Sequence, residues 1–255
     1  MDMESHIESL ADVQRLLLPD DLRLRGLEYA VHYQPAEIAA GDYYDLMPLG
    51  GLAPEGYDAK ARAELWGMML GDVSGHGPAA AMEAVQFDAI LRTYRGDEPP
   101  LGPAGALTYA NRYFFSRRQR RHFMTVFAVV SRPDRNELEY VSAGHPPALL
   151  RRGNLLQRLG EDGEIPLGID RTHRYSNSTC PFGPGDILVA YTDGIPEARD
   201  PAGTPFGLER IERIVALSPA EPTAILDALR RALFAHQQCE VGSDDQSLIV
   251  LRQGS

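Results

Sequence analysis

The chain has 255 residues, of which 44% are hydrophobic, and its 25 basic and 36 acidic side chains give a formal net charge of −11. This length and apolar content suffice for one large domain with a substantial core. The acidic balance argues against a nucleic-acid-binding protein, because such proteins cluster lysine and arginine over a broad face. An acidic protein is better suited to metal ions and basic partners.

The cysteines, the N-terminus and the hydropathy pattern bear on location. Cys180 and Cys239 lack the paired spacing of a metal site, and the first residues lack the basic and apolar regions of a secretory signal. No segment approaches the roughly 18 apolar residues that a transmembrane helix requires. We therefore expect a cytoplasmic protein that neither inserts into a membrane nor binds nucleic acid.

An amphipathic helix is expected at the N-terminus, from Ser5 to Leu18. Gln14 interrupts its apolar pattern and Pro19 ends it; the apolar residues at helical spacing are Met3, Ile7, Leu10 and Leu17. Such a helix can pack on its own domain, pair with a second copy, or follow an upstream sensor module. We assign residues 1–19 to this helix, as a regulatory or dimerisation linker, and residues 20–255 to the main domain.

The rest of the chain alternates between blocks of strands and blocks of helices. A loop is expected at residues 52–63 and a solvated helix end at the arginines of 117–121. Strands are predicted at 27–33, 42–49, 64–70, 124–130, 136–143, 147–151, 173–179, 186–192 and 247–252, and helices after 77 and at 104–115, 208–217 and 223–236. This order favours an α+β domain, with antiparallel sheets that carry helices on their outer faces, over a parallel βαβ fold.

Four acidic motifs lie where apolar strands begin or end: Gly41-Asp42, Gly71-Asp72, Asp193-Gly194 and Asp244-Asp245. Each alone is an ordinary turn former. Together, they predict a site for one or two hard divalent cations, because such ions prefer oxygen ligands. Asp45 lies an odd number of residues from Asp42, so the two face opposite sides of a strand and only Asp42 is assigned to the site.

Two histidines are candidates for accessory roles. His76 follows the Gly71-Asp72 turn, where it is either a general acid or a residue that caps the helix or fixes the turn. His145 either fixes a sheet corner or contacts the substrate. The seven histidines show no His-Glu-x-x-His pattern, and no Gly-Lys-Ser or Gly-Lys-Thr phosphate loop is present, which argues against a zinc hydrolase and a P-loop enzyme.

The motifs, taken in order, resemble the SpoIIE/RsbU type, the bacterial branch of the metal-dependent serine/threonine phosphatases of type 2C (the PPM superfamily). The resemblance spans roughly Leu18 to Leu251 and rests on Gln34-Pro35-Ala36, Gly41 to Asp45, Asp72 to Gly77, Ala143 to Pro147, Tyr191 to Gly194, Phe206-Gly207 and Asp244-Asp245. It implies a sandwich of two antiparallel β-sheets flanked by antiparallel helix pairs. Ala40 departs from the family, which usually has a second glycine there, and so does Gln246-Ser247, which replaces an apolar residue and a threonine.

The resemblance also implies a ligand set for two Mn²⁺ or Mg²⁺ ions. Asp42 and Asp72 would be bridging or near-bridging ligands, and Val73 would lend its backbone carbonyl. Asp193 and Asp244 would complete the site, with Asp245, His76 and Gly194 as further possible members. A water bound between the ions would then hydrolyse a phosphoserine or phosphothreonine monoester without a covalent enzyme intermediate. The four aspartates would act in catalysis through that water.

By the same resemblance, the substrate is a phosphorylated anti-sigma-factor antagonist of the STAS type, whose dephosphorylation frees a sigma factor. A protein of another class is also compatible with the motifs: a catalytically silent module with the phosphatase fold that binds a phosphoprotein partner. A metal-sensing switch is a third alternative.

Overall fold

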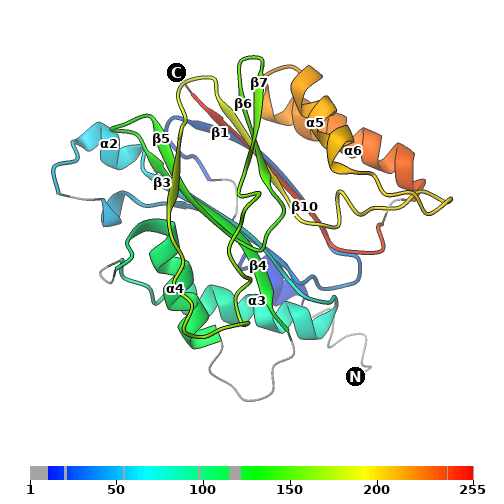
Figure 1. The fold of residues 1–255 in the computed structure, drawn as a ribbon, viewed down its shortest axis with the longest axis horizontal. Helices are drawn as coiled ribbons and strands as arrows, with labels where there is room; N and C mark the ends of the chain where they lie inside the picture. Colours follow the sequence, from blue (N-terminus) through cyan, green and yellow to red (C-terminus); the bar gives the residue numbers. More distant parts are fainter. Residues whose placement is uncertain are drawn as a thin grey trace.

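The computed structural model describes residues 11–19, 22–53, 55–96, 99–114, 122–239 and 241–254, and its centre is a pair of five-stranded antiparallel sheets (Figure 1). The first sheet has the order β1-β10-β9-β6-β7 and the second β2-β3-β4-β5-β8. Helices α5 and α6 lie beside the first sheet, and α3 and α4 lie beside the second. The predicted α+β sandwich is therefore confirmed.

The elements have the following bounds. In the first sheet these are β1 Leu27–Gln34, β6 Ala148–Arg152, β7 Leu155–Leu159, β9 Ile187–Tyr191 and β10 Gln246–Gln253. In the second sheet they are β2 Asp42–Pro48, β3 Trp66–Val73, β4 Met124–Arg132, β5 Glu137–Ala143 and β8 Ser178–Pro181. The helices are η1 Gly50–Leu52, α2 Ala59–Ala63, α3 Pro78–Leu91, α4 Gly102–Phe114, α5 Leu208–Leu217 and α6 Pro222–Gln237. Residues 11–15 are also helical.

Three apolar clusters hold the layers together, one between the sheets and one under each helix pair. Strand β3 shows how one strand serves two of them. Met68 and Leu70 lie in the cluster between the sheets, whereas Met69 and Val73 lie in the cluster under α3 and α4. The alternation follows from the two-residue period of a strand, and an almost continuous apolar run results because both faces of β3 are covered.

Three predictions of local structure were wrong. The strand predicted at 173–179 begins only at Ser178, because side chains take up the preceding backbone amides: Thr108 Oγ1 accepts from Tyr175 N and Glu164 Oε1 accepts from Ser176 N. The edge strand β7 was not predicted, since its sequence, Leu-Leu-Gln-Arg-Leu, does not alternate between apolar and polar residues. The loop predicted at 52–63 contains the short helix α2, whose first turn is capped by Asp58.

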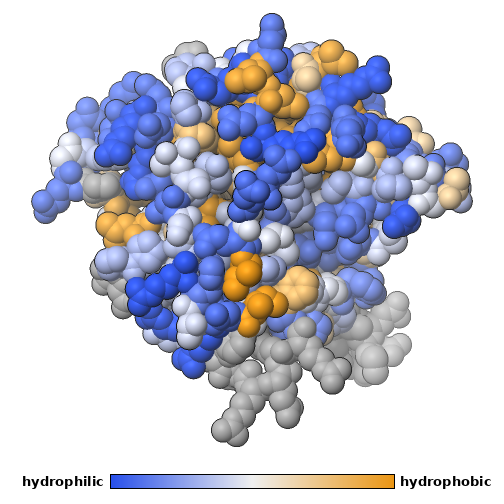
Figure 2. All heavy atoms as spheres, viewed as in Figure 1, coloured by the Kyte–Doolittle hydropathy of each residue, from blue (hydrophilic) through white to orange (hydrophobic). Residues whose placement is uncertain are grey.

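Two predictions concern residues that the structure does not describe. The helix predicted from Ser5 is seen only from Ala11, and the arginines Arg117, Arg118, Arg120 and Arg121 lie outside the described residues. No helix among the described residues is long and apolar enough to span a bilayer. On the face drawn in Figure 2, hydrophilic side chains predominate and hydrophobic ones form small separate patches.

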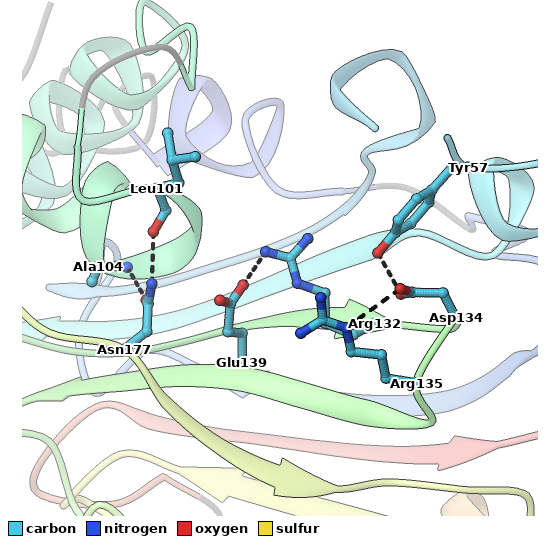
Figure 3. A network of polar contacts seen from close by, with 8 residues as sticks. All are labelled: Tyr57, Leu101, Ala104, Arg132, Asp134, Arg135, Glu139 and Asn177. Atoms are coloured by element: carbon cyan, nitrogen blue, oxygen red, sulfur yellow. Dashed lines mark hydrogen bonds and ion pairs between the residues drawn. The ribbon is translucent and has the colours of Figure 1, made fainter. Parts of the chain in front are cut away.

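A polar network closes the end of the second sheet where β4 ends and β5 begins (Figure 3). Arg132 forms an ion pair with Glu139 across these strands. Nearby, Asn177 Oδ1 accepts from Ala104 N at 2.8 Å and its Nδ2 donates to Leu101 O at 2.7 Å, so this side chain fixes the first turn of α4. The opposite end of the sandwich carries the acidic motifs.

Candidate functional site

The topology brings the four acidic motifs to one end of the sandwich. Strand β2 begins at Asp42 and the antiparallel β3 ends just after Asp72, so these two aspartates are register partners on adjacent strands. Strand β9 ends two residues before Asp193, and its antiparallel neighbour β10 begins directly after Asp245. The two sheets meet here, because Ser247 on β10 hydrogen-bonds to the Asp42 side chain on β2.

Asp42 is the most buried member, with 1% of its surface exposed. Its Oδ2 accepts from Ser247 Oγ at 2.6 Å and from Thr192 Oγ1 at 2.9 Å. Its Oδ1 is also buried and has no hydrogen-bond partner among the described residues. Burial raises the pKa of Asp42 well above its ordinary value, although the Ser247 hydroxyl opposes this. A buried carboxylate oxygen without a partner is the group that a cation would satisfy.

Burial and the charges of neighbouring carboxylates raise the pKa of Asp72 and of Asp193. Burial, followed by the charge of Asp42 and then of Asp193 and Asp244, raises the pKa of Asp72 to about 10. Burial and then the charge of Asp244 raise the pKa of Asp193 to about 6. Like charges on register partners of adjacent strands are destabilising, and here two further carboxylates approach the same pair. The cluster therefore favours either bound protons or a bound cation.

The complete ligand set is not assembled in this structure. Among the described residues, no three acidic, histidine or cysteine side chains are arranged to hold a metal ion. What fits a divalent cation is the chemistry of the donor set, which consists of carboxylates, and the buried oxygen of Asp42. The ligand set of Asp42, Asp72, Val73, Asp193 and Asp244 stays a prediction.

Asp245 holds a loop through both of its carboxylate oxygens, and its charge also acts on Asp42 and Asp72. Its Oδ1 accepts from Ala36 N and its Oδ2 from Gly41 N, both at 2.7 Å, so both carboxylate oxygens bind the segment that leads into β2. Gly41 fits there because a Cβ would lie 2.9 Å from Val73 O. Ala40 does not have a positive φ, so its difference from the usual family glycine introduces no backbone strain.

Gly194 is also required for close approach, since a Cβ at this position would collide with the backbone oxygen of Asp245. Val73 N donates to Gly41 O at 3.3 Å, which ties the end of β3 to the residue before Asp42. Both residues thus bring backbone segments together at the acidic end. Thr192, which donates to Asp42, was not singled out from the sequence; its place next to Asp193 is the only signal that could have found it.

The two histidines occupy different environments. His76 is exposed, and its Nδ1 lies 2.9 Å from Glu37 Oε1. His145 is buried, its Nδ1 lies 2.9 Å from Thr125 Oγ1, and burial lowers its pKa to about 3. His145 is therefore neutral at physiological pH and part of a packed corner. Asp45 lies on the other face of β2, where the charges that act on it are those of Arg92 and Asp88, as the odd spacing from Asp42 predicted.

The protein-family model for stage II sporulation protein E (SpoIIE) matches residues 62–254 of the chain. The chain belongs to the SpoIIE family. It is 24% identical over 272 residues to protein IcfG of Synechocystis, and 26% identical over 195 and 258 residues to the phosphoserine phosphatases RsbP and RsbU of Bacillus subtilis. These alignments cover 96%, 73% and 99% of this chain but 41%, 45% and 71% of the relatives, so the chain spans less than half of IcfG and RsbP.

Solved structures of other proteins share its fold. The SiaA-PP2C domain of Pseudomonas aeruginosa superposes with a TM-score of 0.80 at 20% identity, covering 98% of this chain and 96% of that domain. RsbX in complex with magnesium has a TM-score of 0.64 at 14% identity, covering 91% of this chain and 97% of RsbX. This member of the SpoIIE family therefore has the fold of the type 2C phosphatases.

Proposed function

We propose that this chain is a metal-dependent protein serine/threonine phosphatase that hydrolyses phosphoserine or phosphothreonine on a regulatory protein. The observation that carries the proposal is the pairing of Asp42 with Asp72 on adjacent strands, with one buried oxygen of Asp42 left without a partner. Family membership and the phosphatase fold support the same reaction. The names of RsbP and RsbU, both phosphoserine phosphatases, agree with it.

The residues that would hold two Mn²⁺ or Mg²⁺ ions are Asp42, Asp72, Asp193 and Asp244 with the backbone carbonyl of Val73. When bound, such ions neutralise phosphoryl charge and make water nucleophilic at neutral pH. Carboxylates at the ends of the rigid strands β2 and β3 suit this role, because a ligand on a fixed backbone loses little entropy on binding.

Two hydroxyl groups of this chain would fix the orientation of the Asp42 carboxylate. Thr192 and Ser247 both donate to Oδ2 of Asp42, which leaves Oδ1 as the oxygen available to a cation. A carboxylate fixed in this way cannot rotate to bind elsewhere. His76 is the candidate to protonate the leaving serine oxygen. It is exposed, lies two residues before α3 and pairs with Glu37. A role in fixing that turn is the alternative for His76.

For the substrate we propose a phosphorylated protein of the STAS type, with dephosphorylation regulating a sigma factor in signal transduction. This step rests on the relatives RsbP and RsbU. An upstream sensor module, or self-association through the N-terminal helix, would supply the control. A catalytically silent module that binds a phosphoprotein remains the second candidate, because no three ligands are preassembled among the described residues.

Hydrolysis of p-nitrophenyl phosphate and of a phosphoserine peptide, with and without Mn²⁺, tests the proposal. We expect turnover that requires Mn²⁺ and that falls at least about a hundredfold in Asp193→Asn, which removes one ligand charge. Asp162→Asn, which makes the same change on an exposed residue, serves as the matched control and keeps full activity. Equal rates for the wild type and Asp193→Asn would exclude the enzymatic role and leave the silent module.

A further inference from the structure

A cavity of about 580 Å³ lies between the second sheet and the helices α3 and α4. Three alternate residues of β2, which share one face of the strand, line its floor: Tyr43, Asp45 and Met47. On β3, Gly67 and Met69 also line the cavity, and they are the register partners of Met47 and Asp45. The floor is therefore the face of the sheet that the helices cover.

The other walls of the cavity are apolar. Leu91 of α3 and Pro103 and Ala106 of α4 line it from the helix side. Leu52 and Leu101 line it as well, and both are more than half exposed, at 57% and 55%, so the cavity is open to solvent beside them. A volume between about 300 and 1,000 Å³ with a mostly apolar lining and a few polar groups is typical of sites for small molecules.

One carboxylate of the lining is fully paired. Asp88 on α3 is only 3% exposed. Its Oδ1 accepts from the Tyr43 hydroxyl at 3.0 Å, and its Oδ2 accepts from Arg92 Nε at 2.8 Å. The charges of Asp88 and Arg92 thus offset each other within the wall of the cavity.

The second carboxylate, Asp45, gives the cavity an excess of negative charge. It is 9% exposed, and burial raises its pKa to about 6, with the charge of Arg92 opposing this and that of Asp88 adding to it. Asp45 is therefore mostly ionised at neutral pH. Arg132, the other cation of the lining, forms an ion pair with Glu139 (Figure 3). Two carboxylates and one guanidinium remain, which leaves one negative charge beside apolar walls.

We propose that this cavity binds a small organic cation, with an ammonium group that pairs with Asp45 and an apolar body that fills the space between β3 and α4. A neutral apolar ligand would displace water from the carboxylate and give nothing in return, and an anionic ligand would be repelled. The inference goes beyond the proposed function and does not depend on it. By the two-residue period of β2 and β3, Asp42 and Asp72 lie on the opposite face of the sheet.

Three probes with the same apolar body test the proposal: 4-phenylbutylamine, 4-phenylbutanol and 4-phenylbutyrate, which are cationic, neutral and anionic at neutral pH. They are titrated into the full chain, labelled with ¹³C at the methionine methyl groups, in the presence of EDTA. The methyl signals of Met47 and Met69 report on the cavity that they line. Met82, which is 54% exposed on α3, supplies the control signal.

We expect the amine to shift the signals of Met47 and Met69 to saturation and to leave that of Met82 in place. The amine should bind at least about tenfold more tightly than the alcohol, because a charge-assisted hydrogen bond shielded from water contributes this much. The butyrate should bind most weakly.

Two variants divide the effect into charge and shape. Asp45→Asn keeps the size of the side chain and removes its charge, so the affinity for the amine should fall to that for the alcohol, whereas the alcohol binds as before. Asp162→Asn, on an exposed residue, is the matched control and should bind all three probes as the wild type does. Ala106→Leu fills part of the cavity and should weaken binding of the amine and the alcohol alike.

Either half of the proposal can fail. If none of the probes shifts Met47 and Met69, the cavity is not a ligand site. Equal affinities for the amine and the butyrate, or an unchanged affinity for the amine in Asp45→Asn, would overturn the assignment of a cation. Should Asp45→Asn not fold, the three probes on the wild type and on Ala106→Leu still decide both points. None of these results depends on Mn²⁺ or on turnover, so the proposed function stands or falls separately.

Discussion

Replacing Asp72 by asparagine should stabilise the metal-free protein while abolishing its response to metal. Asp72 faces Asp42 across adjacent strands, and burial together with the neighbouring carboxylates raises its pKa to about 10. In the unfolded chain the same carboxyl titrates near its ordinary value of 3.8. Folding at neutral pH therefore requires this group to take up a proton that it does not carry in the unfolded chain.

The magnitude follows from that difference. Protonating a carboxyl at pH 7, about 3 pH units above its ordinary pKa of 3.8, costs about 4 kcal/mol. Asparagine is neutral and nearly the same size, so Asp72→Asn should recover a few kcal/mol, with about 4 kcal/mol as the upper value.

The pH dependence has a definite sign. A carboxyl whose pKa is raised in the folded state binds more protons there than in the unfolded chain, so the free energy of unfolding falls as pH rises. For Asp72 the fall extends from about pH 4 towards pH 10, and for Asp193 from about pH 4 to about 6. The metal-free wild type should lose stability between pH 5 and 8, and Asp72→Asn should lose less.

Urea denaturation at pH 5, 6, 7 and 8 in the presence of EDTA measures these free energies, and Asp162→Asn controls for the loss of one exposed charge. Adding Mn²⁺ should raise the wild-type unfolding midpoint and leave that of Asp72→Asn unchanged. If Asp72→Asn is less stable than the wild type at pH 7 without metal, the carboxylates do not repel one another as inferred.

Three further substitutions test separate parts of the structure. Ser247→Ala removes a donor from the buried carboxylate of Asp42 and should weaken Mn²⁺ binding in calorimetry about tenfold, whereas Ser247→Thr should not; equal loss in both would contradict the role of the hydroxyl. Gly41→Ala should destabilise the fold by about 1–3 kcal/mol in urea, because its Cβ has no room, while Gly51→Ala, in open space, should not. Asn177→Ala should lower the free energy of unfolding by about 1–2 kcal/mol and leave the Mn²⁺ affinity unchanged, because Asn177 fixes the start of α4 far from the site.

The periodicity of apolar residues predicted antiparallel strands with helices on their outer faces, whereas the sandwich of two sheets was implied by the family resemblance. Strands β2 and β3 alternate between two apolar clusters, and the parity of Asp42 and Asp45 placed them on opposite faces, as observed. Strand β7 was not predicted because its leucines do not alternate with polar residues in the two-residue period of a strand. The extended segment before β8 looks like a strand in sequence, yet Thr108 and Glu164 take up its backbone amides, and those partners lie 67 and 12 residues away.

The sequence predicted which acidic motifs belong to the candidate site, but not what each side chain contacts. Asp244 and Asp245 are adjacent in sequence, and only the fold shows that both carboxylate oxygens of Asp245 accept hydrogen bonds from the loop before β2. Gln14 interrupts the apolar pattern of the predicted N-terminal helix, and only the fold shows that its carboxamide binds the backbone of Ala40 in the loop before β2. Both roles depend on contacts between residues far apart in sequence, which local pattern does not encode.

These contacts also explain why the acidic end can exist at all. Hydroxyl donors from Thr192 and Ser247 offset part of the cost of burying Asp42. For Asp72, burial and then the charges of the neighbouring carboxylates raise the pKa to about 10. A fold that was only structural would gain stability by replacing Asp72 with a neutral residue. Carboxylates kept at such a cost are best explained by a cation that binds them, since a positive charge between Asp42 and Asp72 would replace the repulsion between their carboxylates by attraction to the ion.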